Sequence, residues 1–143
     1  MFLLDTNVIS ELRKPNACNQ NVLNWAQRHK HAEFFLSVIT IFEIEKGILQ
    51  HERRNREQAT TLRHWLENSV IRNFADRILA VDLPVARRCA QLHIPDPRSE
   101  RDALIAATAL VHSLIVVTRN ISDFTDTGVK LLNPWNFTET GNK

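Results

Sequence analysis

Phe2-Leu3-Leu4-Asp5-Thr6-Asn7-Val8-Ile9 opens the chain with an apolar run that stops at an acid and continues as an amphipathic pattern. The three apolar residues predict a short buried strand, and the spacing over 8–13 predicts a helix directly after it. A carboxylate beside a core is costly unless it is paired, hydrogen-bonded or bound to a metal. Asp5 is therefore the first candidate functional residue.

The ends of this first helix follow from local residue types. Thr6 or Asn7 is the expected N-cap, since both side chains can accept a hydrogen bond from a free backbone N–H. Pro15 and Asn16 are expected to end the helix, because proline cannot continue its hydrogen bonds.

The rest of the chain repeats the alternation of strand and helix. Strands are expected at 33–37, 78–81, 114–117 and 129–132, and helices at 22–29, 39–50, 56–71, 84–92 and 102–112. Such alternation implies parallel strands with crossover helices. The sequence predicts an α/β protein with a three-layer α/β/α fold and a mainly parallel central sheet of four to five strands. Residues 1–135 are expected to form a single domain, and residues 136–143 a disordered C-terminal tail without pattern.

Composition places the chain among ordinary globular proteins. It has 143 residues, of which 43% are hydrophobic and 24% charged, enough for one domain with a real core. Only 3 glycines are present, and neither GxxxxGK[ST] nor GxGxxG occurs, so a glycine-rich phosphate loop is excluded. The formal net charge of +2 does not by itself require a nucleic-acid partner.

Cysteine usage and hydropathy bear on location. Cys18 and Cys89 form neither a disulfide framework nor a zinc-ligand pair, which favours a reducing compartment. No signal-peptide pattern is visible, and the longest apolar run is far shorter than the roughly 20 residues that cross a bilayer. We expect a cytoplasmic protein without a membrane partner.

Three further acids stand at the edges of apolar segments. Glu43 interrupts the apolar stretch that begins at 36–42, Asp102 opens a helix rich in small residues, and Asp123 follows the strand at 114–117 by a short turn. In parallel sheets, ligands bind beyond the carboxyl ends of the strands, where these acids and Asp5 can meet. Carboxylate oxygens are the ligands that Mg²⁺ or Mn²⁺ prefers.

Each acid also has an ordinary structural interpretation. Asp5 can cap the following helix, and Glu43 can lie on a helix surface. Asp102 can form half of a capping box with Ser99, and Asp123 can be a turn residue. Local basic clusters at 51–56, at Arg87 and Arg88, and at Arg98 and Arg101 are interpreted as solvent-exposed faces.

Four motifs then carry a family resemblance. Residues 4–11 (LDTNVISE), 37–47 (SVITIFEIEKG), 101–109 (RDALIAATA) and 117–124 (VTRNISDF) resemble, in order, the motifs of PIN-domain nucleases, especially VapC-type toxins and their FitB-like relatives. Residues 128–135 resemble the closing strand and turn of that family. Many relatives carry an acid where Asn120 stands here, which bears on a second metal position.

The resemblance implies an Mg²⁺-dependent endoribonuclease, with Mn²⁺ as a possible substitute. The implied metal ligands and catalytic residues are Asp5, Glu43, Asp102 and Asp123. Hydrogen bonds to these ligands or contacts to phosphate are expected from Thr6, Thr118 and Asn120. The phosphates of the RNA substrate are expected to lie against basic residues around the rim, namely Arg13, Lys14, Arg53, Arg54 and Arg119.

The resemblance also implies partners. A cognate antitoxin is expected to neutralise the toxin, within a type II toxin–antitoxin module, and to place an apolar helix in a groove near Ile9, Leu12 and the helix that holds Trp25. The alternative interpretation of these residues is ordinary core. A homodimer and a larger assembly with antitoxin are expected, with DNA contacted only through the antitoxin. Two alternatives remain for the function: a PIN nuclease acting on DNA, and a non-catalytic antitoxin-binding co-repressor.

Overall fold

The central sheet is fully parallel and has β1 in its middle. In the computed structural model, which describes residues 1–14 and 16–139, five strands form one sheet in the order β3-β2-β1-β4-β5. The strands are β1 Phe2–Leu4, β2 Phe34–Ser37, β3 Ile78–Leu79, β4 Ile115–Val117 and β5 Leu131–Leu132. Phe2 pairs with Phe34 on one side and with Ile115 on the other. The chain adds β2 and β3 on one side of β1, and then β4 and β5 on the other side. Parallel sheets place ligand sites at such a switch point, here between β1 and β4.

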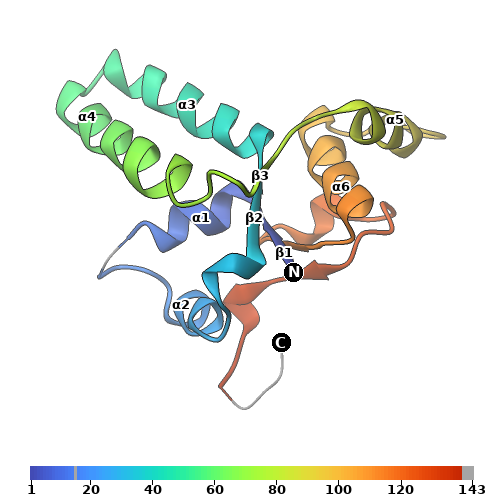
Figure 1. Cartoon of the computed structure of the whole chain (residues 1–143), viewed down its shortest axis with the longest axis horizontal. Coiled ribbons are helices and arrows are strands. Elements are labelled where there is room, and N and C mark those ends of the chain that lie inside the picture. The colour runs from blue at the N-terminus through green and yellow to red at the C-terminus, as the bar shows by residue number, and fades with distance from the viewer. Residues whose placement is uncertain (15, 140–143) are drawn as a thin grey trace.

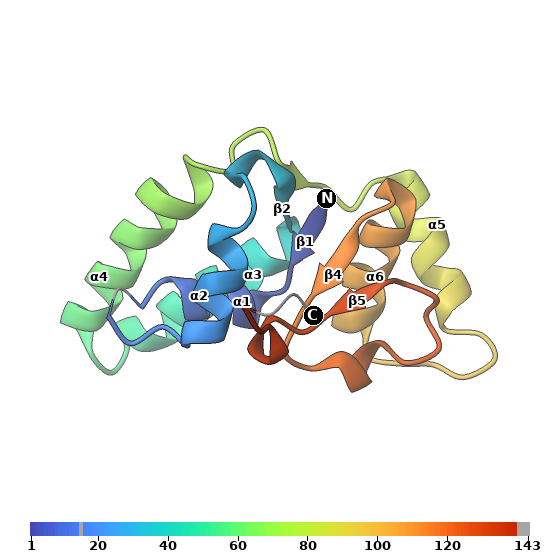
Figure 2. The same ribbon diagram turned by 90° about the horizontal axis from the view of Figure 1, so that it is seen from below.

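Helices cover both faces of this sheet, so the predicted three-layer α/β/α architecture is confirmed (Figures 1 and 2). The helices are α1 Thr6–Leu12, α2 Gln20–Gln27, α3 Val38–Glu52, α4 Arg56–Trp65, α5 Leu83–Leu92 and α6 Glu100–His112. Shorter turns of helix are η1 His31–Glu33, η2 Leu66–Ile71, η3 Ile121–Phe124 and η4 Pro134–Asn136. Over the described part of the chain, none of these helices has the length and apolar character needed to cross a bilayer.

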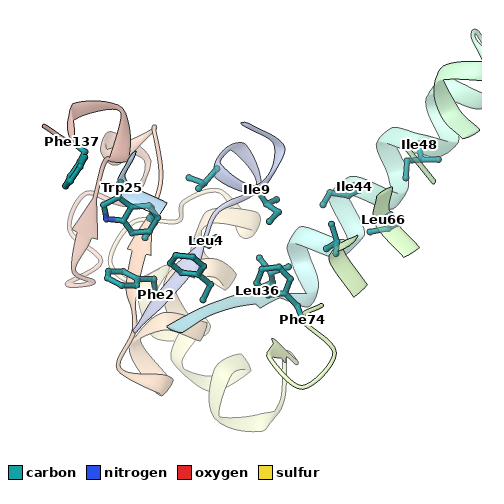
Figure 3. Packing of buried hydrophobic residues seen from close by; sticks show 14 of the residues in the cluster. Phe2, Leu4, Ile9, Trp25, Leu36, Ile44, Ile48, Leu66, Phe74 and Phe137 are labelled. Carbon is teal, nitrogen blue, oxygen red and sulfur yellow. The ribbon is translucent and has the colours of Figure 1, made fainter. Parts of the chain in front are cut away.

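The two faces of the sheet are set by the period of two along each strand. Leu4 and Leu36 point to the face covered by α1 to α4, where they join a large apolar cluster. Figure 3 shows this cluster running from Phe137 and Trp25 across the strands toward α3. Leu3 on β1 instead points to the opposite face, where it packs among residues of α6. The outer helix α5 packs on α6 in turn.

Local boundaries differ from the sequence-based expectation at the first helix. The N-cap of α1 is Asp5, whose side chain accepts the backbone N–H of Thr6, so the prediction of Thr6 or Asn7 as the cap is wrong. Pro15, which was expected to end this helix, lies outside the described residues. The expected helix over 56–71 is α4 followed by a π-helical segment.

The end of the chain makes a core contact that no sequence pattern predicted. Phe137 is 6% exposed and belongs to the large apolar cluster, and Arg28 lies over its ring at 5.6 Å. Arg28 also forms an ion pair with Glu139. The expectation of a disordered tail is therefore wrong at Phe137, and residues 140–143 of that expected tail lie outside the described residues.

Candidate active site

Asp5 lies at the centre of the site because it follows the central strand. Its backbone N–H donates to Val117 O at 2.9 Å, which continues the pairing of β1 with β4 by one residue. Its side chain is 1% exposed; Oδ1 accepts the Thr6 N–H at 2.8 Å, and Oδ2 accepts the Thr118 hydroxyl at 2.9 Å. The helix-cap interpretation of Asp5 is therefore correct, and it does not exclude a role in the site.

Glu43 reaches the same place from the second turn of α3. That helix begins after Ser37, whose hydroxyl accepts the Ile39 N–H at 2.9 Å, directly beyond the end of β2. The Thr6 hydroxyl donates to Oε1 of Glu43 and lies 3.2 Å from the Thr40 hydroxyl oxygen. Thr6 thus connects the start of α1 to the carboxylate on α3.

Asp102 comes from the first turn of α6. Ser99 caps this helix and accepts the Asp102 N–H at 3.3 Å, as the capping-box spacing predicted. The Asp102 side chain is largely buried at 14% exposure, so it is turned toward the molecule and not toward solvent.

Arg101 joins the three carboxylates, and sequence reasoning missed this role. Its Nε donates to Glu43 Oε2 at 2.6 Å, and its Nη1 donates to Asp102 Oδ1 at 2.9 Å. Its Nη2 donates to Asp5 Oδ1 and, at 3.0 Å, to Glu43 Oε1. The only available signal was its place beside Asp102 in the third motif, because an isolated arginine in a basic patch is usually solvated.

The charges of this cluster are mutually stabilised. Burial raises the pKa of the Glu43 carboxyl, but hydrogen bonds from Arg101 and Thr6 outweigh burial and leave that pKa below its ordinary value. Burial lowers the pKa of Arg101, whereas its hydrogen bonds to Glu43 and Asp5 raise the pKa above its ordinary value overall. The site therefore holds a charged Arg101 guanidinium against an ionised Glu43 carboxylate at neutral pH.

Asp123 and Asn120 lie on the rim of the same pocket. This pocket, about 520 Å³ in volume, is lined by Thr6, Asn7, Glu43, Arg101, Asp102, Asn120 and Asp123. Asp123 is exposed on η3, and among the described residues no hydrogen bond joins it to the three inner acids. The backbone N–H of Asn120 donates to the Thr118 hydroxyl at 3.0 Å, so the residue is tied to the site through its main chain.

Asn7 is a second residue that sequence reasoning did not assign to the site. Its Oδ1 accepts the Arg119 N–H at 3.2 Å, and its Nδ2 lies 3.4 Å from the Thr118 hydroxyl. It therefore joins the start of α1 to the turn after β4. The position two residues after Asp5 in the first motif was the available signal.

The donor set fits a hard divalent cation. Three carboxylates from separate segments already surround one positive charge, which is the electrostatic environment that Mg²⁺ or Mn²⁺ requires. Their oxygens are nevertheless spread around a planar guanidinium. Metal ligands can also come from histidine and cysteine. Among the described His, Cys, Asp and Glu residues, the only group of three with ligand atoms all within 4.8 Å of one another lies elsewhere, at Cys89, His93 and Glu100.

That other group is better explained as a hydrogen-bonded contact between α5 and α6. His93 Nδ1 accepts the Arg98 N–H at 3.2 Å, so in the neutral ring the proton is on Nε2, which faces Glu100 Oε1 at 3.5 Å. A histidine that binds a metal through Nε2 normally donates from Nδ1, which the Arg98 N–H opposes. Burial and the neighbouring Glu100 raise the pKa of the Cys89 thiol, which also disfavours the thiolate that a metal needs.

The basic residues expected around the pocket rim differ in their distance from it. Arg119 follows Thr118 directly, and its guanidinium lies over the Trp135 ring at 5.1 Å. Arg13 lies over the ring of Trp65 at 5.6 Å, while Lys14 is paired with Glu11 at 3.0 Å. Arg53 and Arg54 come directly after the far end of α3, about 15 Å along the helix from Glu43 at 1.5 Å per residue.

A cleft lies where the partner groove was expected, between α1 and the helix that holds Trp25. Ile9 and Leu12 line a cleft of about 300 Å³ between α1, α2 and the segment after α4. Trp25 is 1% exposed and packs edge-on against Phe2 at 5.2 Å, so the core interpretation is correct for Trp25.

Comparison with known proteins agrees with this geometry. Residues 2–130 match the family model described as PIN domain. The chain is 38% identical to Toxin FitB of Neisseria gonorrhoeae over 140 residues, covering 94% of this chain and 99% of FitB. It is 36% identical to VapC ribonuclease Y4jK of Sinorhizobium fredii, also over 140 residues, covering 94% of this chain and 98% of that ribonuclease.

A solved structure extends the agreement to three dimensions. The structure of FitAB bound to an IR36 DNA fragment contains a chain that is 36% identical to this one, with a TM-score of 0.85, over 96% of this chain and 98% of that chain. The family match spans both sides of the sheet and every segment that contributes to the carboxylate cluster. The chain belongs to the PIN-domain family.

Proposed function

We propose that this protein is the ribonuclease toxin of a type II toxin–antitoxin module, an endoribonuclease that hydrolyses RNA phosphodiester bonds with a divalent metal. The observation that carries the proposal is that Asp5, Glu43 and Asp102 meet at the carboxyl edge of the sheet, where all three pair with the Arg101 guanidinium. The likeness to Toxin FitB and to a VapC ribonuclease supports the reaction class.

The metal ligands would be Asp5, Glu43 and Asp102, with Asp123 completing the set from the pocket rim. Mg²⁺ is the proposed ion and Mn²⁺ a substitute, because both are hard cations that prefer carboxylate oxygens. When bound, such an ion activates a water, neutralises charge on the reacting phosphate and stabilises the leaving oxygen.

The chain's own residues hold this arrangement in place. Thr118 fixes one oxygen of Asp5, and Thr6 fixes one oxygen of Glu43, so neither carboxylate rotates freely. Asn120 lines the pocket, where its side chain can contact the phosphates of the substrate. Arg119 precedes it in the chain and would have to leave the Trp135 ring to do the same.

The proposed partner is a cognate antitoxin that blocks this site. Its apolar segment would occupy the cleft lined by Ile9 and Leu12, while DNA would be contacted through the antitoxin and not by this chain. A homodimer and a larger assembly with antitoxin are part of the proposal. The reduced thiols of Cys18 and Cys89 suit a cytoplasmic location.

Cleavage of a mixed RNA pool with and without EDTA tests the proposal. Wild-type protein should cleave with Mg²⁺ and stop with EDTA, and Asp5→Asn or Asp102→Asn should lower the rate on the order of 10²-fold or more. A matched single-stranded DNA pool distinguishes the ribonuclease from a nuclease acting on DNA. Equal growth arrest by wild type and Asp5→Ala in cells would instead support a non-catalytic binder.

A further inference from the structure

Arg101 pairs with all three carboxylates that the proposed function assigns to a metal ion. The guanidinium donates hydrogen bonds to both oxygens of Glu43, to Oδ1 of Asp5 and to Oδ1 of Asp102. These are the same oxygens that the proposed function assigns to metal binding. The side chain is 30% exposed, so it lies over the cluster from the pocket side and is not enclosed by the core.

The guanidinium also sets the spacing of the carboxylates. A metal ion draws its oxygen ligands to within 2.0–2.1 Å of one centre for Mg²⁺. Within the described residues, these acids do not bring three ligand atoms within 4.8 Å of one another. Direct binding of all three carboxylates to one ion would therefore require them to move inward, into the space that the guanidinium occupies.

Two cations cannot share these oxygens without strong repulsion, because the site is partly buried and poorly screened. We propose that Arg101 is an internal counter-cation that competes with the divalent metal, so that the metal binds only when Arg101 swings out of the cluster. This inference rests on the proposed function of the carboxylates. It makes the arrangement with Arg101 on the carboxylates a closed resting state. The observed metal affinity then reflects the difference between the binding free energies of the metal ion and of the guanidinium at these oxygens.

The test is direct measurement of metal affinity by calorimetric titration with Mn²⁺. Arg101→Gln should bind Mn²⁺ at least about fivefold more tightly than wild type, in the range typical of coupled equilibria. The Mn²⁺ affinity of Arg101→Lys should lie between those of wild type and Arg101→Gln, since an ammonium keeps the charge but makes fewer directed hydrogen bonds. Arg88→Gln removes one exposed charge on α5 and serves as the control, with unchanged affinity expected.

Asp5→Asn separates failure of this inference from failure of the proposed function. If Asp5→Asn binds Mn²⁺ as well as wild type, the proposed metal site itself is wrong. If Asp5→Asn loses binding while Arg101→Gln binds equally or more weakly than wild type, the competition is wrong and the metal site stands.

A measurement on wild-type protein covers the case in which Arg101→Gln fails to fold. The Nε–H signal of Arg101, observed by NMR, should be protected from solvent exchange without metal, because Nε donates to Glu43 at 2.6 Å. Addition of Mg²⁺ should remove that protection, whereas the Nε–H of Arg98, which donates to Leu92 O at 3.0 Å, should keep it. Unchanged protection of Arg101 at saturating Mg²⁺ would overturn the proposal.

Discussion

Thr118 donates its hydroxyl to Oδ2 of Asp5 at 2.9 Å in a fully buried position, although 113 residues separate the two in the sequence. The bond joins the residue after β4 to the residue after β1, the two strands at the centre of the sheet. It therefore holds the central acid of the site at the point where the strand order reverses.

Thr118→Val should destabilise the protein and lower its activity. The substitution keeps the shape but leaves a buried carboxylate oxygen without its donor, which costs about 1–3 kcal/mol. Urea denaturation should show this loss, and cleavage assays should show a lower rate because Asp5 is less well oriented.

Two variants make this result specific. Thr118→Ser keeps the hydroxyl and should retain most of the activity. Thr108→Val removes a buried hydroxyl that donates to Leu104 O at 2.8 Å inside α6, away from the site. If Thr108→Val impairs cleavage as much as Thr118→Val does, the effect reflects general stability and not the orientation of Asp5.

Divalent metal should stabilise the folded protein. A ligand that binds only the folded state adds about 1.4 kcal/mol at ten times its Kd, so Tm should rise with Mg²⁺ and fall back with EDTA. Asp102→Asn should reduce the shift because it removes one of the carboxylates around the cluster. KCl at matched ionic strength is the control, and an equal shift with KCl would attribute the effect to screening.

Phe137→Ala should destabilise the fold by about 3 kcal/mol, the usual cost of truncating a buried phenylalanine. Phe137 is 6% exposed and packs in the large cluster, beyond the expected domain boundary at residue 135. Thermal unfolding measures the loss. Arg28→Gln, which removes the cation over that ring and an exposed ion pair, should cost less than about 1 kcal/mol; a wild-type Tm for Phe137→Ala would support a domain that ends at residue 135.

Glu11 should make stability depend on acid pH. Its Oε2 accepts the Asn19 N–H at 2.7 Å, and its Oε1 accepts a hydrogen bond from the Lys14 ammonium at 3.0 Å. These bonds hold the pKa of Glu11 below its ordinary value of 4.5. Because the folded state has the lower pKa, the stabilisation is fully present above pH 4.5 and is lost as pH falls through the folded value.

Comparison of wild type with Glu11→Gln isolates this contribution. The variant should be less stable by about 1 kcal/mol at pH 7, and the difference should shrink at pH 3. Asp76→Asn is the control, since the Asp76 side chain is 90% exposed. A difference between wild type and Glu11→Gln that stays constant from pH 7 to pH 3 would contradict the assignment.

Sequence patterns predicted the fold well because the decisive signals are local. Each strand is an apolar run bounded by a polar residue, and the period of two along β1 already assigns Leu3 and Leu4 to opposite faces. Asp5 was identifiable as a site residue for the same reason, as an acid directly beyond a buried strand.

Features that depend on distant contacts were not predictable in this way. Arg101 looks like a solvated charge until α6 is placed beside α3, because nothing in its neighbours along the chain indicates Glu43. Phe137 has no periodic partner along the chain, so its place in the large apolar cluster was not predictable from its neighbours. The interpretation of Asp5 as a helix cap was set against a site role, whereas one oxygen, Oδ1, does both by accepting the Thr6 N–H and an N–H of Arg101.

The position of β4 beside β1 also determines when the site can form during synthesis. Chains emerge from the ribosome N-terminus first, and the central pairing of Leu3 with Val116 cannot form until more than three quarters of the chain has been made. Thr118, which donates to Asp5, likewise belongs to that last part, whereas Asp102 is made earlier, at the start of α6. Under the proposed function, truncated products that lack this part would contain Asp5, Glu43 and Asp102 without β4 and without the Thr118 hydroxyl that holds Asp5, so RNA cleavage would require a nearly complete chain.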